Sequence, residues 1–295
     1  MLGTALRKAL ASRGTRILQL VRREPSSEGE IRWDPAATKP LADSGQLEGL
    51  TAAIHLSGAN VAAHRWTASY KREMAISRVE STRAVASILS VLRQPPAAFV
   101  AASATGVYGN RGDELLDERS SSGNGFLADL CRAWEASAQP AADAGIRVLH
   151  ARFGVVLDAQ DGALAKMLLP FKLGLGGRLG SGRQWMSWIS LADAIAALLF
   201  LADSPELAGP FNFTAPEPVT NSAFTRALAR TVHRPAVLPA PAFALRLAFG
   251  LMADEALLAS ARVFPAKLTA AGFSFAHATI DQALAAALQQ GRGLS

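Results

Sequence analysis

The sequence predicts an α/β fold with a doubly wound parallel sheet, and two observations lead to this prediction. Short, mostly apolar runs lie at 52–58, 97–103 and 146–157. Runs of this length and composition are typical of strands that are covered on both faces. Helical stretches at 66–92 and 125–138 separate these runs. Strands that alternate with helices favour a parallel sheet with helical crossover connections.

The chain begins with an amphipathic helix that starts near Gly3 and ends at Gly14, which has the position of a C-terminal cap. The apolar run 15–21 follows as a buried strand and ends in two arginines. In a Rossmann-like dinucleotide fold, this helix comes after a first strand and two further glycines. We therefore expect the natural start to lie upstream of Met1, and we expect the strands beside the absent one to lack a hydrogen-bonding partner. An in-frame stop codon just before Met1 would contradict this expectation.

Composition excludes several classes of protein. Half of the 295 residues are hydrophobic and 18% are charged, so wholesale disorder is excluded. The single cysteine, Cys131, excludes an internal disulfide and fits a reducing, cytoplasmic compartment. The five histidines have no metal-ligand spacing. The longest apolar stretch, 191–203, is too short to span a bilayer and contains Asp193. These features predict neither a metal nor a membrane partner.

The net charge of +6 invites a nucleic-acid interpretation. Most basic residues are single arginines scattered along the chain, without a basic run or interleaved aromatics, so we predict no nucleic-acid partner. The N-terminus is arginine-rich and has no acid before Glu24, which also fits a mitochondrial transit peptide. The pattern of a helix followed by a strand explains more of the same residues.

The second half has a different character, and we place a division near residue 160. A dinucleotide-binding region, incomplete at its N-terminus, spans 1–160, and a substrate-side region spans 161–295. The stretch 172–190 is rich in glycine and contains two tryptophans. Its glycines do not form a phosphate-binding loop, because no Gly-Lys-Ser/Thr follows. Ser190 is expected to cap the helix that follows, and Thr279 and Gln282 are spaced as the capping box of a last helix.

Candidate site residues follow the predicted strands, because ligands of open α/β sheets bind at the carboxyl ends of the strands. Arginine after the second strand of such a fold pairs with the extra phosphate of NADP, whereas an acid there binds the ribose of NAD. The alternative for this position is a solvated basic turn. Small residues after the strand at 52 allow a close approach of the backbone to a cofactor, or form an ordinary tight turn. Ser103 ends the next strand, where its hydroxyl could polarise a reacting oxygen or simply satisfy buried backbone. The residues concerned are Arg22, Arg23, Leu56, Ser57, Gly58 and Ser103.

Several longer motifs add a resemblance. "HLSGAN", "SATGVYG", "RFGVVL", "LLPFKLGLGGRLGSGRQWMSWI", "NFTAPEPVTN" and "ADEALLASARVFPAKLTAAGFSF" occur in this order. The chain resembles the nucleoside-diphosphate-sugar epimerase-like branch of the extended short-chain dehydrogenase/reductases, from Gly3 to about residue 288. The family's glycine motif before the first helix is represented here only by its last glycine, Gly3.

The resemblance implies a cofactor and assigns residues to it. Members of this branch look like NADP(H) binders, so Arg22 and Arg23 would contact the 2′-phosphate. Leu56, Ser57 and Gly58 would lie along the cofactor. Glu73 and Arg78 would reach the adenosine or phosphate side of the cofactor. Ser103 would match the catalytic Ser/Thr of the superfamily. Asp193 and the tryptophan loop before it would belong to the region that closes over the substrate.

The proton-transfer pair of the superfamily, Tyr-x-x-x-Lys, does not occur in this chain. Tyr70 is followed four residues later by Met74, and Tyr108 by Gly112. Alignment of the 125–138 helix by its glutamate places Leu127 and Cys131 at the tyrosine and lysine positions. Tyr108 is a candidate acid because it lies close to Ser103, and the alternative is that it packs in its turn. Cys131 lacks a histidine at useful spacing and is expected to be a buried thiol.

Two functions remain open from the sequence. The first is an NADP(H)-dependent oxidoreductase or epimerase-like protein that acts on a small polar molecule such as a sugar derivative. The second is a protein that holds NADP(H) as a sensor or structural ligand without turnover, which the absent Tyr-x-x-x-Lys favours. The sequence leaves the substrate, the direction of reaction and the oligomeric state undetermined.

Overall fold

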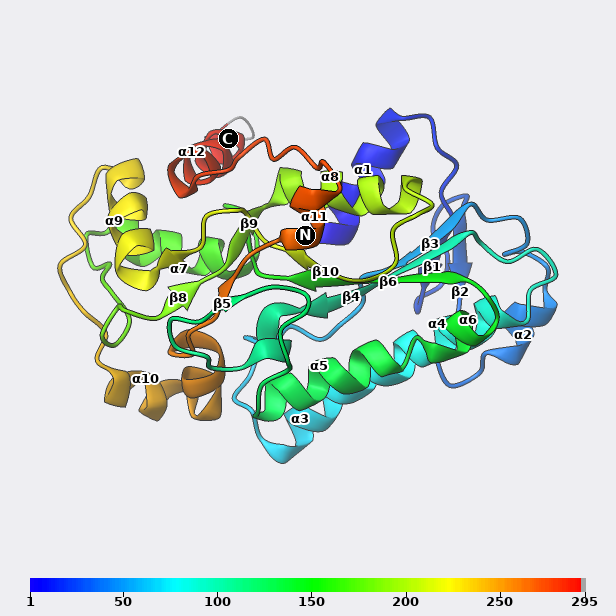
Figure 1. The fold of residues 1–295 in the computed structure, drawn as a ribbon, viewed down its shortest axis with the longest axis horizontal. Helices are drawn as coiled ribbons and strands as arrows, with labels where there is room; N and C mark the ends of the chain where they lie inside the picture. The colour runs from blue at the N-terminus through cyan, green and yellow to red at the C-terminus, as the bar shows by residue number, and fades with distance from the viewer. Residues whose placement is uncertain (293–295) are drawn as a thin grey trace.

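The computed structural model describes residues 1–292 and is organised around a parallel sheet. Four strands form this sheet in the order β10-β6-β4-β3, and every neighbouring pair is parallel. The four strands are Gly209–Phe213, Arg147–Phe153, Ala98–Ala104 and Ala52–His55. Parallel neighbours require crossover connections, which helices supply here (Figure 1). The predicted α/β architecture is confirmed.

A second, smaller sheet holds the strand that follows the first helix. β1 (Gln19–Val21) pairs in parallel with β2 (Glu30–Arg32) and with no strand of the larger sheet. β3 is paired only with β4, so its other edge has no strand partner among residues 1–292. β1 is shorter than the predicted run 15–21.

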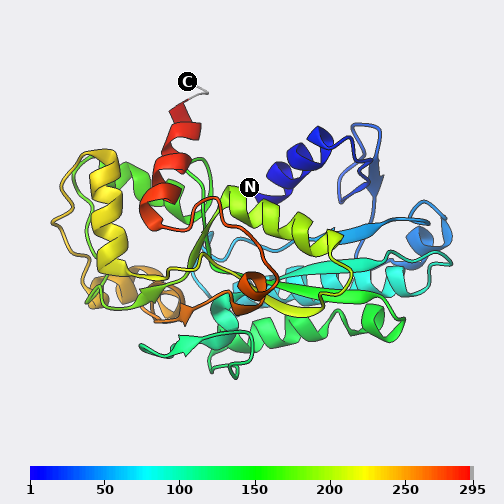
Figure 2. The same ribbon diagram turned by 45° about the horizontal axis from the view of Figure 1, so that its top comes forward.

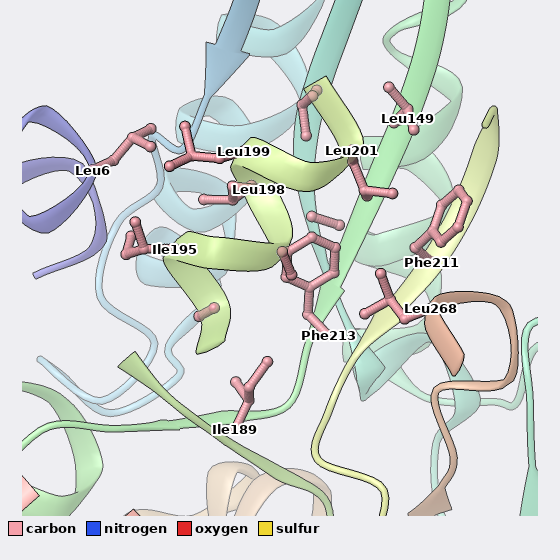
Figure 3. Packing of buried hydrophobic residues seen from close by; sticks show 14 of the residues in the cluster. Leu6, Leu149, Ile189, Ile195, Leu198, Leu199, Leu201, Phe211, Phe213 and Leu268 are labelled. Atoms are coloured by element: carbon pink, nitrogen blue, oxygen red, sulfur yellow. The ribbon is translucent and has the colours of Figure 1, made fainter. Parts of the chain in front are cut away.

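Helices cover both faces of the four-stranded sheet (Figures 1 and 2). Alternate residues of β4 point to opposite faces, so Val100 packs in one core cluster and Phe99 in another. The cluster around Val100 includes Leu198 of α8 (Leu191–Asp203) and Leu6 of α1 (Leu2–Ser12), as Figure 3 shows for α8 and α1. The other face is covered by α4 (Ser81–Ser90), α5 (Phe126–Ala136) and α6 (Gln139–Asp143).

The long helical stretch predicted at 66–92 is helical, but it is not a uniform α-helix. α3 (Ala68–Ala75) continues into a π-helical turn at Ile76–Glu80, and α4 follows directly. Thr67 caps the start of α3 by accepting a hydrogen bond from the Tyr70 N–H. π-Helical turns are rare and frequently occur at functional sites. This turn carries Arg78, one of the predicted cofactor residues.

The apolar run at 146–157 forms two strands instead of one. β6 ends at Phe153, and β7 (Val155–Leu157) leaves the main sheet to pair with β9 (Trp188–Ser190). Gly154 lies at the break, where a Cβ atom would come within 2.5 Å of the Ser187 carbonyl oxygen. Only glycine fits at this close approach, so the glycine redirects the chain. Residues on both sides of position 160 nevertheless build the main sheet, because β10 pairs with β6.

The remaining elements form the C-terminal region and the connections. They are α2 (Lys39–Asp43), β5 (Leu115–Leu116), α7 (Gly162–Lys172), β8 (Trp185–Met186), β11 (Val219–Thr220), α9 (Asn221–Val232), α10 (Ala242–Phe249), a second π-helical turn (Ala253–Leu257), β12 (Arg262–Val263), α11 (Ala266–Ala270) and α12 (Ile280–Arg292), together with a short 3-10 turn at Thr105–Tyr108. Both predicted caps are confirmed. Ser190 Oγ accepts from the Asp193 N–H, and the Thr279 N–H donates to Gln282 Oε1 while Thr279 Oγ1 accepts from the Gln282 N–H. Within the described part of the chain, no helix has the length and apolar composition needed to cross a bilayer.

Candidate functional site

The loop after β3 lies at the carboxyl edge of the sheet. Leu56 is half-buried, whereas Ser57 and Gly58 are exposed. Arg78 reaches this loop from the π-helical turn and donates to the Ala59 carbonyl at 2.9 Å. A Cβ atom at Gly58 would lie 3.2 Å from the Arg78 guanidinium carbon, so glycine allows this close packing. Arg78 and the small-residue loop are therefore in direct contact.

Arg78 is buried although it carries a charge. Its guanidinium stacks over the Trp134 ring at 5.1 Å and also donates to the Met74 carbonyl at 3.3 Å. Burial lowers the pKa of Arg78 below its usual value. Glu73, in contrast, is exposed on α3. Arg78 thus supports the loop from behind, and Glu73 remains available at the surface.

The two arginines after β1 differ in their surroundings. The Arg23 guanidinium donates to both carboxylate oxygens of Glu30, at 2.6 and 2.8 Å, and to Ser26 Oγ. These bonds and the Ser26 N–H lower the pKa of Glu30 to about 2. Arg22 is exposed and forms no ion pair with any carboxylate among residues 1–292. Of the two predicted phosphate ligands, Arg22 is the one whose charge is not already matched.

Gly3 lies in the first turn of α1 and is exposed. A Cβ atom there would meet nothing within 4 Å, so space is open in front of this residue.

Ser103 lies in a buried polar network that crosses three strands. In the sheet register, Ser103 of β4 is opposite Arg152 of β6, and Arg152 is opposite Asn212 of β10. Ser103 Oγ donates to Glu135 Oε1 of α5 at 2.6 Å, and Arg152 makes two hydrogen bonds to the same carboxylate at 2.7 and 2.8 Å. Ser103 is only 2% exposed. Its hydroxyl proton is therefore directed at Glu135 and not at the open edge.

Tyr108 belongs to the same network. It lies in a short 3-10 turn, Thr105–Tyr108, and is fully buried. Its hydroxyl donates to Asn212 Oδ1 at 2.8 Å and accepts from Arg152 at 3.0 Å. Burial raises the pKa of Tyr108 even though the charge of Arg152 opposes the rise. The phenol is therefore neutral at physiological pH, and its hydroxyl is occupied by hydrogen bonds to Asn212 and Arg152.

The charges of the network stabilise each other. Burial alone would raise the pKa of Glu135, but the hydrogen bonds and charge of Arg152, together with Ser103, lower it below its usual value. Burial opposes the charge of Arg152, but its bonds to Glu135 outweigh this and raise its pKa. Both groups are thus ionised near neutral pH. A salt bridge of this kind, with its remaining hydrogen-bonding capacity satisfied, compensates much of the desolvation cost.

The helix that carries Tyr-x-x-x-Lys in the superfamily has apolar groups at those positions. Leu127 is half-buried against Gly106, and Cys131 is buried in the same contact. Burial raises the pKa of Cys131 to about 12, so its thiol is neutral. Glu255, from the C-terminal region, accepts hydrogen bonds from the Phe126 and Leu127 N–H groups at 3.0 and 2.8 Å. A carboxylate thus caps this helix at its first turn, where the N–H groups have no partner within the helix.

The tryptophan loop and Asp193 form mainly internal contacts. Trp188 is fully buried and donates to the Glu217 carbonyl, while Trp185 is half-buried and donates to Asp113 Oδ1. Asp193 is 1% exposed and accepts from the Ala276 and His277 N–H groups. Its carboxylate therefore holds the start of α8 against the segment before α12.

Sequence reasoning missed three features of this region. The arginine at 152 lies near the end of a strand whose neighbouring positions 151 and 153 are apolar, and this is a signal for a buried partner, but nothing in the sequence identifies Glu135 as that partner. Thr105 lies just past β4 with a half-buried side chain, and its Oγ1 donates to the Phe153 carbonyl at 3.3 Å, a position that no motif in the sequence marks. Glu255 is more than a hundred residues from the helix that it caps, so no local pattern indicates the contact.

Family models match most of the chain. Residues 1–213 match the model described as "NAD dependent epimerase/dehydratase family", and residues 240–287 match a domain of unknown function, DUF1731. Epimerase family protein Mb2239 of Mycobacterium bovis is 44% identical over 284 residues, which cover 96% of this chain and 93% of that protein. Epimerase family protein MW0731 of Staphylococcus aureus is 39% identical over 232 residues, which cover 78% of this chain and 77% of that protein.

Solved structures agree with these matches. The crystal structure of human epimerase family protein SDR39U1 (isoform2) with NADPH has a TM-score of 0.90 at 32% identity and covers 98% of this chain and 96% of that one. A nucleoside-diphosphate sugar epimerase from Corynebacterium glutamicum has a TM-score of 0.78 at 33% identity and covers 98% of this chain and 56% of that one. UDP-glucose 4-epimerase from Thermus thermophilus, at 16% identity and a TM-score of 0.78, is similar in fold. The predicted resemblance is confirmed, and the chain belongs to the NAD dependent epimerase/dehydratase family.

Proposed function

We propose that the chain binds NADP(H) at the carboxyl edge of its sheet and is an oxidoreductase or epimerase-like protein for a small polar molecule such as a sugar derivative. The observation that carries the cofactor proposal is the unmatched charge of Arg22 at the end of β1. A guanidinium at this position suits the dianionic 2′-phosphate of NADP(H) and has no counterpart for the free ribose of NAD. The human relative with NADPH supports the same cofactor.

The other predicted residues take places around this cofactor in the proposal. Leu56, Ser57 and Gly58 lie beside it, and Arg78 acts from behind the loop as a positioning residue. Gly3 leaves room for the cofactor at the start of α1. Glu73 lies on the adenosine side of the cofactor. Arg23 contributes by closing the β1–β2 loop on Glu30, which keeps Arg22 beside a fixed turn.

Turnover in this proposal uses a hydroxyl at the end of β4. The nicotinamide, when bound, supplies or accepts the hydride. Thr105 is half-buried, and its hydroxyl donates only a long hydrogen bond, 3.3 Å to the Phe153 carbonyl. We assign to this hydroxyl the contact with the reacting oxygen, for which it exchanges that bond. Ser103 and Tyr108 then act as positioning residues, because their hydroxyls hold the 105–108 turn from below through Glu135, Arg152 and Asn212.

A second function rests on a specific observation, the burial of both predicted catalytic hydroxyls and the apolar groups at the tyrosine and lysine positions. A protein with this arrangement would hold NADP(H) as a sensor or structural ligand without turnover. The thiol of Cys131 is consistent with a reducing compartment, and in either function we place the protein in the cytoplasm.

A fluorescence titration with NADPH and, in parallel, NADH tests the cofactor proposal. We expect tighter binding of NADPH, and Arg22→Ala should weaken NADPH binding about tenfold or more while NADH binding stays unchanged, since a charged hydrogen bond to phosphate is worth about 1.5–3 kcal/mol. Arg119→Ala, which removes an exposed arginine elsewhere, is the matched control. Equal affinity for the two dinucleotides in the unmodified chain would contradict the proposal.

Consumption of bound NADPH with a panel of carbonyl compounds separates the two functions. If the chain is an enzyme, Thr105→Val should abolish most turnover at unchanged NADPH affinity. Ser103→Ala should instead lower the melting temperature and reduce turnover less. Tight NADPH binding without consumption by any compound would favour the non-catalytic function. A larger loss of turnover in Ser103→Ala than in Thr105→Val would assign the catalytic role to Ser103 instead.

A further inference from the structure

A shallow pocket of about 240 Å³ lies between α9 and the glycine-rich loop after α7. Arg178 of the loop and Arg226 of α9 line it, together with Ser222, Thr225 and Val237. Among residues 1–292, neither guanidinium has a carboxylate partner, and neither of the two hydroxyls makes a hydrogen bond. α9 lies at the opposite end of the molecule from β1 and β2, so this pocket is remote from Arg22 (Figures 1 and 2).

The residues that line this pocket include two arginines and no carboxylate. The segments 162–192 and 218–253 contain no aspartate or glutamate. Their basic residues are Lys166, Lys172, Arg178 and Arg183 in the first segment and Arg226, Arg230, Arg234 and Arg246 in the second. The fold brings the two segments together at the pocket, whereas the sequence shows them only as scattered single charges. Arg230 and Arg246 form ion pairs with Asp281 and Asp254, so among residues 1–292 the guanidinium groups at the pocket that keep no carboxylate partner are those of Arg178 and Arg226. A concavity lined by two such groups favours an anionic ligand.

The backbone that carries Arg178 is held in place. The Leu179 N–H donates to Asn221 Oδ1 at 2.8 Å, and the Arg178 carbonyl accepts from the Ala240 N–H at 2.9 Å. The Ser222 N–H donates to the Gly182 carbonyl at 2.8 Å, which ties the loop to the first turn of α9. Gly182 has φ +71°, and the Arg178 stem packs against it. The pocket is thus preformed, and binding there costs little ordering of the backbone.

We propose that this pocket binds a phosphoryl group, held by Arg178 and Arg226 with hydrogen bonds from Ser222 and Thr225. Guanidinium groups match phosphate oxygens in charge and in bidentate geometry, and hydroxyls add uncharged donors. A pocket of about 240 Å³ is smaller than the usual 300–1,000 Å³ of a site for a whole small molecule. It therefore suits the phosphate end of a ligand, with the rest of the ligand outside.

Exposed apolar side chains lie at the pocket lining and beside it, where the Leu238 N–H donates to the Gly176 carbonyl. Val237 is 73% exposed, and Leu238 next to it is 52% exposed. Leu175, close by in the loop, is 57% exposed. The phosphoryl group can therefore belong to a free phosphate compound or to the headgroup of an anionic lipid whose chains meet this rim, and the experiment needs an arm for each source.

Isothermal titration with inorganic pyrophosphate forms the first arm, and flotation with phosphatidylcholine vesicles that contain phosphatidic acid forms the second. We expect saturable binding in at least one arm, weakened about tenfold or more by Arg178→Ala and by Arg226→Ala. Arg226→Lys should weaken it less, because the charge remains while the bidentate geometry is lost. Both arginines are exposed, so these variants should melt at the temperature of the unmodified chain.

Arg119→Ala is the matched control for loss of one exposed charge. Binding in the pyrophosphate arm assigns a free phosphate compound, and binding only to vesicles assigns a lipid headgroup, provided that the arginine variants lose it. Absence of binding in both arms, or equal loss in Arg119→Ala, would overturn the proposal. Competitive displacement of pyrophosphate by NADPH would also overturn it, because the anion would then occupy the cofactor site. NADPH titration of the Arg178→Ala variant should remain normal, which separates this result from the proposed function.

Discussion

Truncation of Glu135 gives the sharpest test of the buried network beneath the site. Glu135 and Arg152 have side chains that are only 15% and 11% exposed, and they share two hydrogen bonds. Glu135→Ala would leave the Arg152 charge without its carboxylate and Ser103 without its acceptor. Removal of one partner from a buried ion pair costs about 3–5 kcal/mol. At about 2 °C per kcal/mol for a chain of this size, the melting temperature should fall by about 6–10 °C.

The assay is calorimetric or urea-induced unfolding, with Glu80→Ala as the control. Glu80 pairs with Arg83 at 3.4 Å, but both side chains are more than half exposed, so its loss should cost about 0.5 kcal/mol or less. A double variant, Glu135→Leu with Arg152→Met, should recover much of the stability, because no unpaired charge remains buried. The reasoning would be refuted if Glu135→Ala unfolded within about 1 kcal/mol of the unmodified chain.

The same network predicts a pH dependence. The folded-state pKa of Glu135 is lowered, so its contribution to stability is complete above the pKa of the unfolded chain. This contribution disappears as the pH falls through the folded-state value. The difference in stability between the unmodified chain and Glu135→Ala should therefore be constant near neutral pH and shrink only in acid. A difference that grew with acidification would have the wrong sign.

Two further predictions concern groups near the site. Cys131 should react extremely slowly with iodoacetamide at pH 8, because a pKa of about 12 leaves a thiolate fraction of about 10⁻⁴. In guanidinium chloride the unfolded chain should react rapidly. Fast labelling of the native chain would contradict the burial of this thiol. Gly58→Val should displace the Arg78 guanidinium and destabilise the chain by about 1–3 kcal/mol in thermal unfolding. Gly3→Ala, which meets open space, should change stability by less than about 1 kcal/mol, and an equal effect of both variants would show that the contact with Arg78 is unimportant.

The local features of this protein could be predicted because each depends on residues close together in the chain. Alternating apolar runs and helical stretches predict the parallel sheet and its crossovers, and the structure has both. The caps at Ser190 and Thr279 are three-residue patterns, and both form. The absence of Tyr-x-x-x-Lys is likewise visible in the sequence alone. Hydrogen bonds over three or four residues need little information about the rest of the fold.

The exceptions arise where distant segments compete with local preference. The run at 146–157 is apolar enough for one strand, but the close approach of the Ser187 carbonyl at Gly154 ends β6 and sends β7 to β9. The helix over 66–92 contains a π-helical turn that turns Arg78 toward the loop after β3. Neither outcome follows from apolarity or helix propensity, because both depend on contacts made across the fold.

The sequence by itself determined the fold class, the family and which chemical groups are present for a site. Only the tertiary structure decided what those groups do, because a polar side chain acquires its role from its partners. Ser103 and Tyr108 stand at promising positions in the sequence, yet sheet register places Arg152 and Glu135 beside them and directs both hydroxyls inward. Conversely, Arg178 and Arg226 are unremarkable single charges in the sequence. They become one basic pocket because a rigid glycine-rich loop is bound to the start of α9.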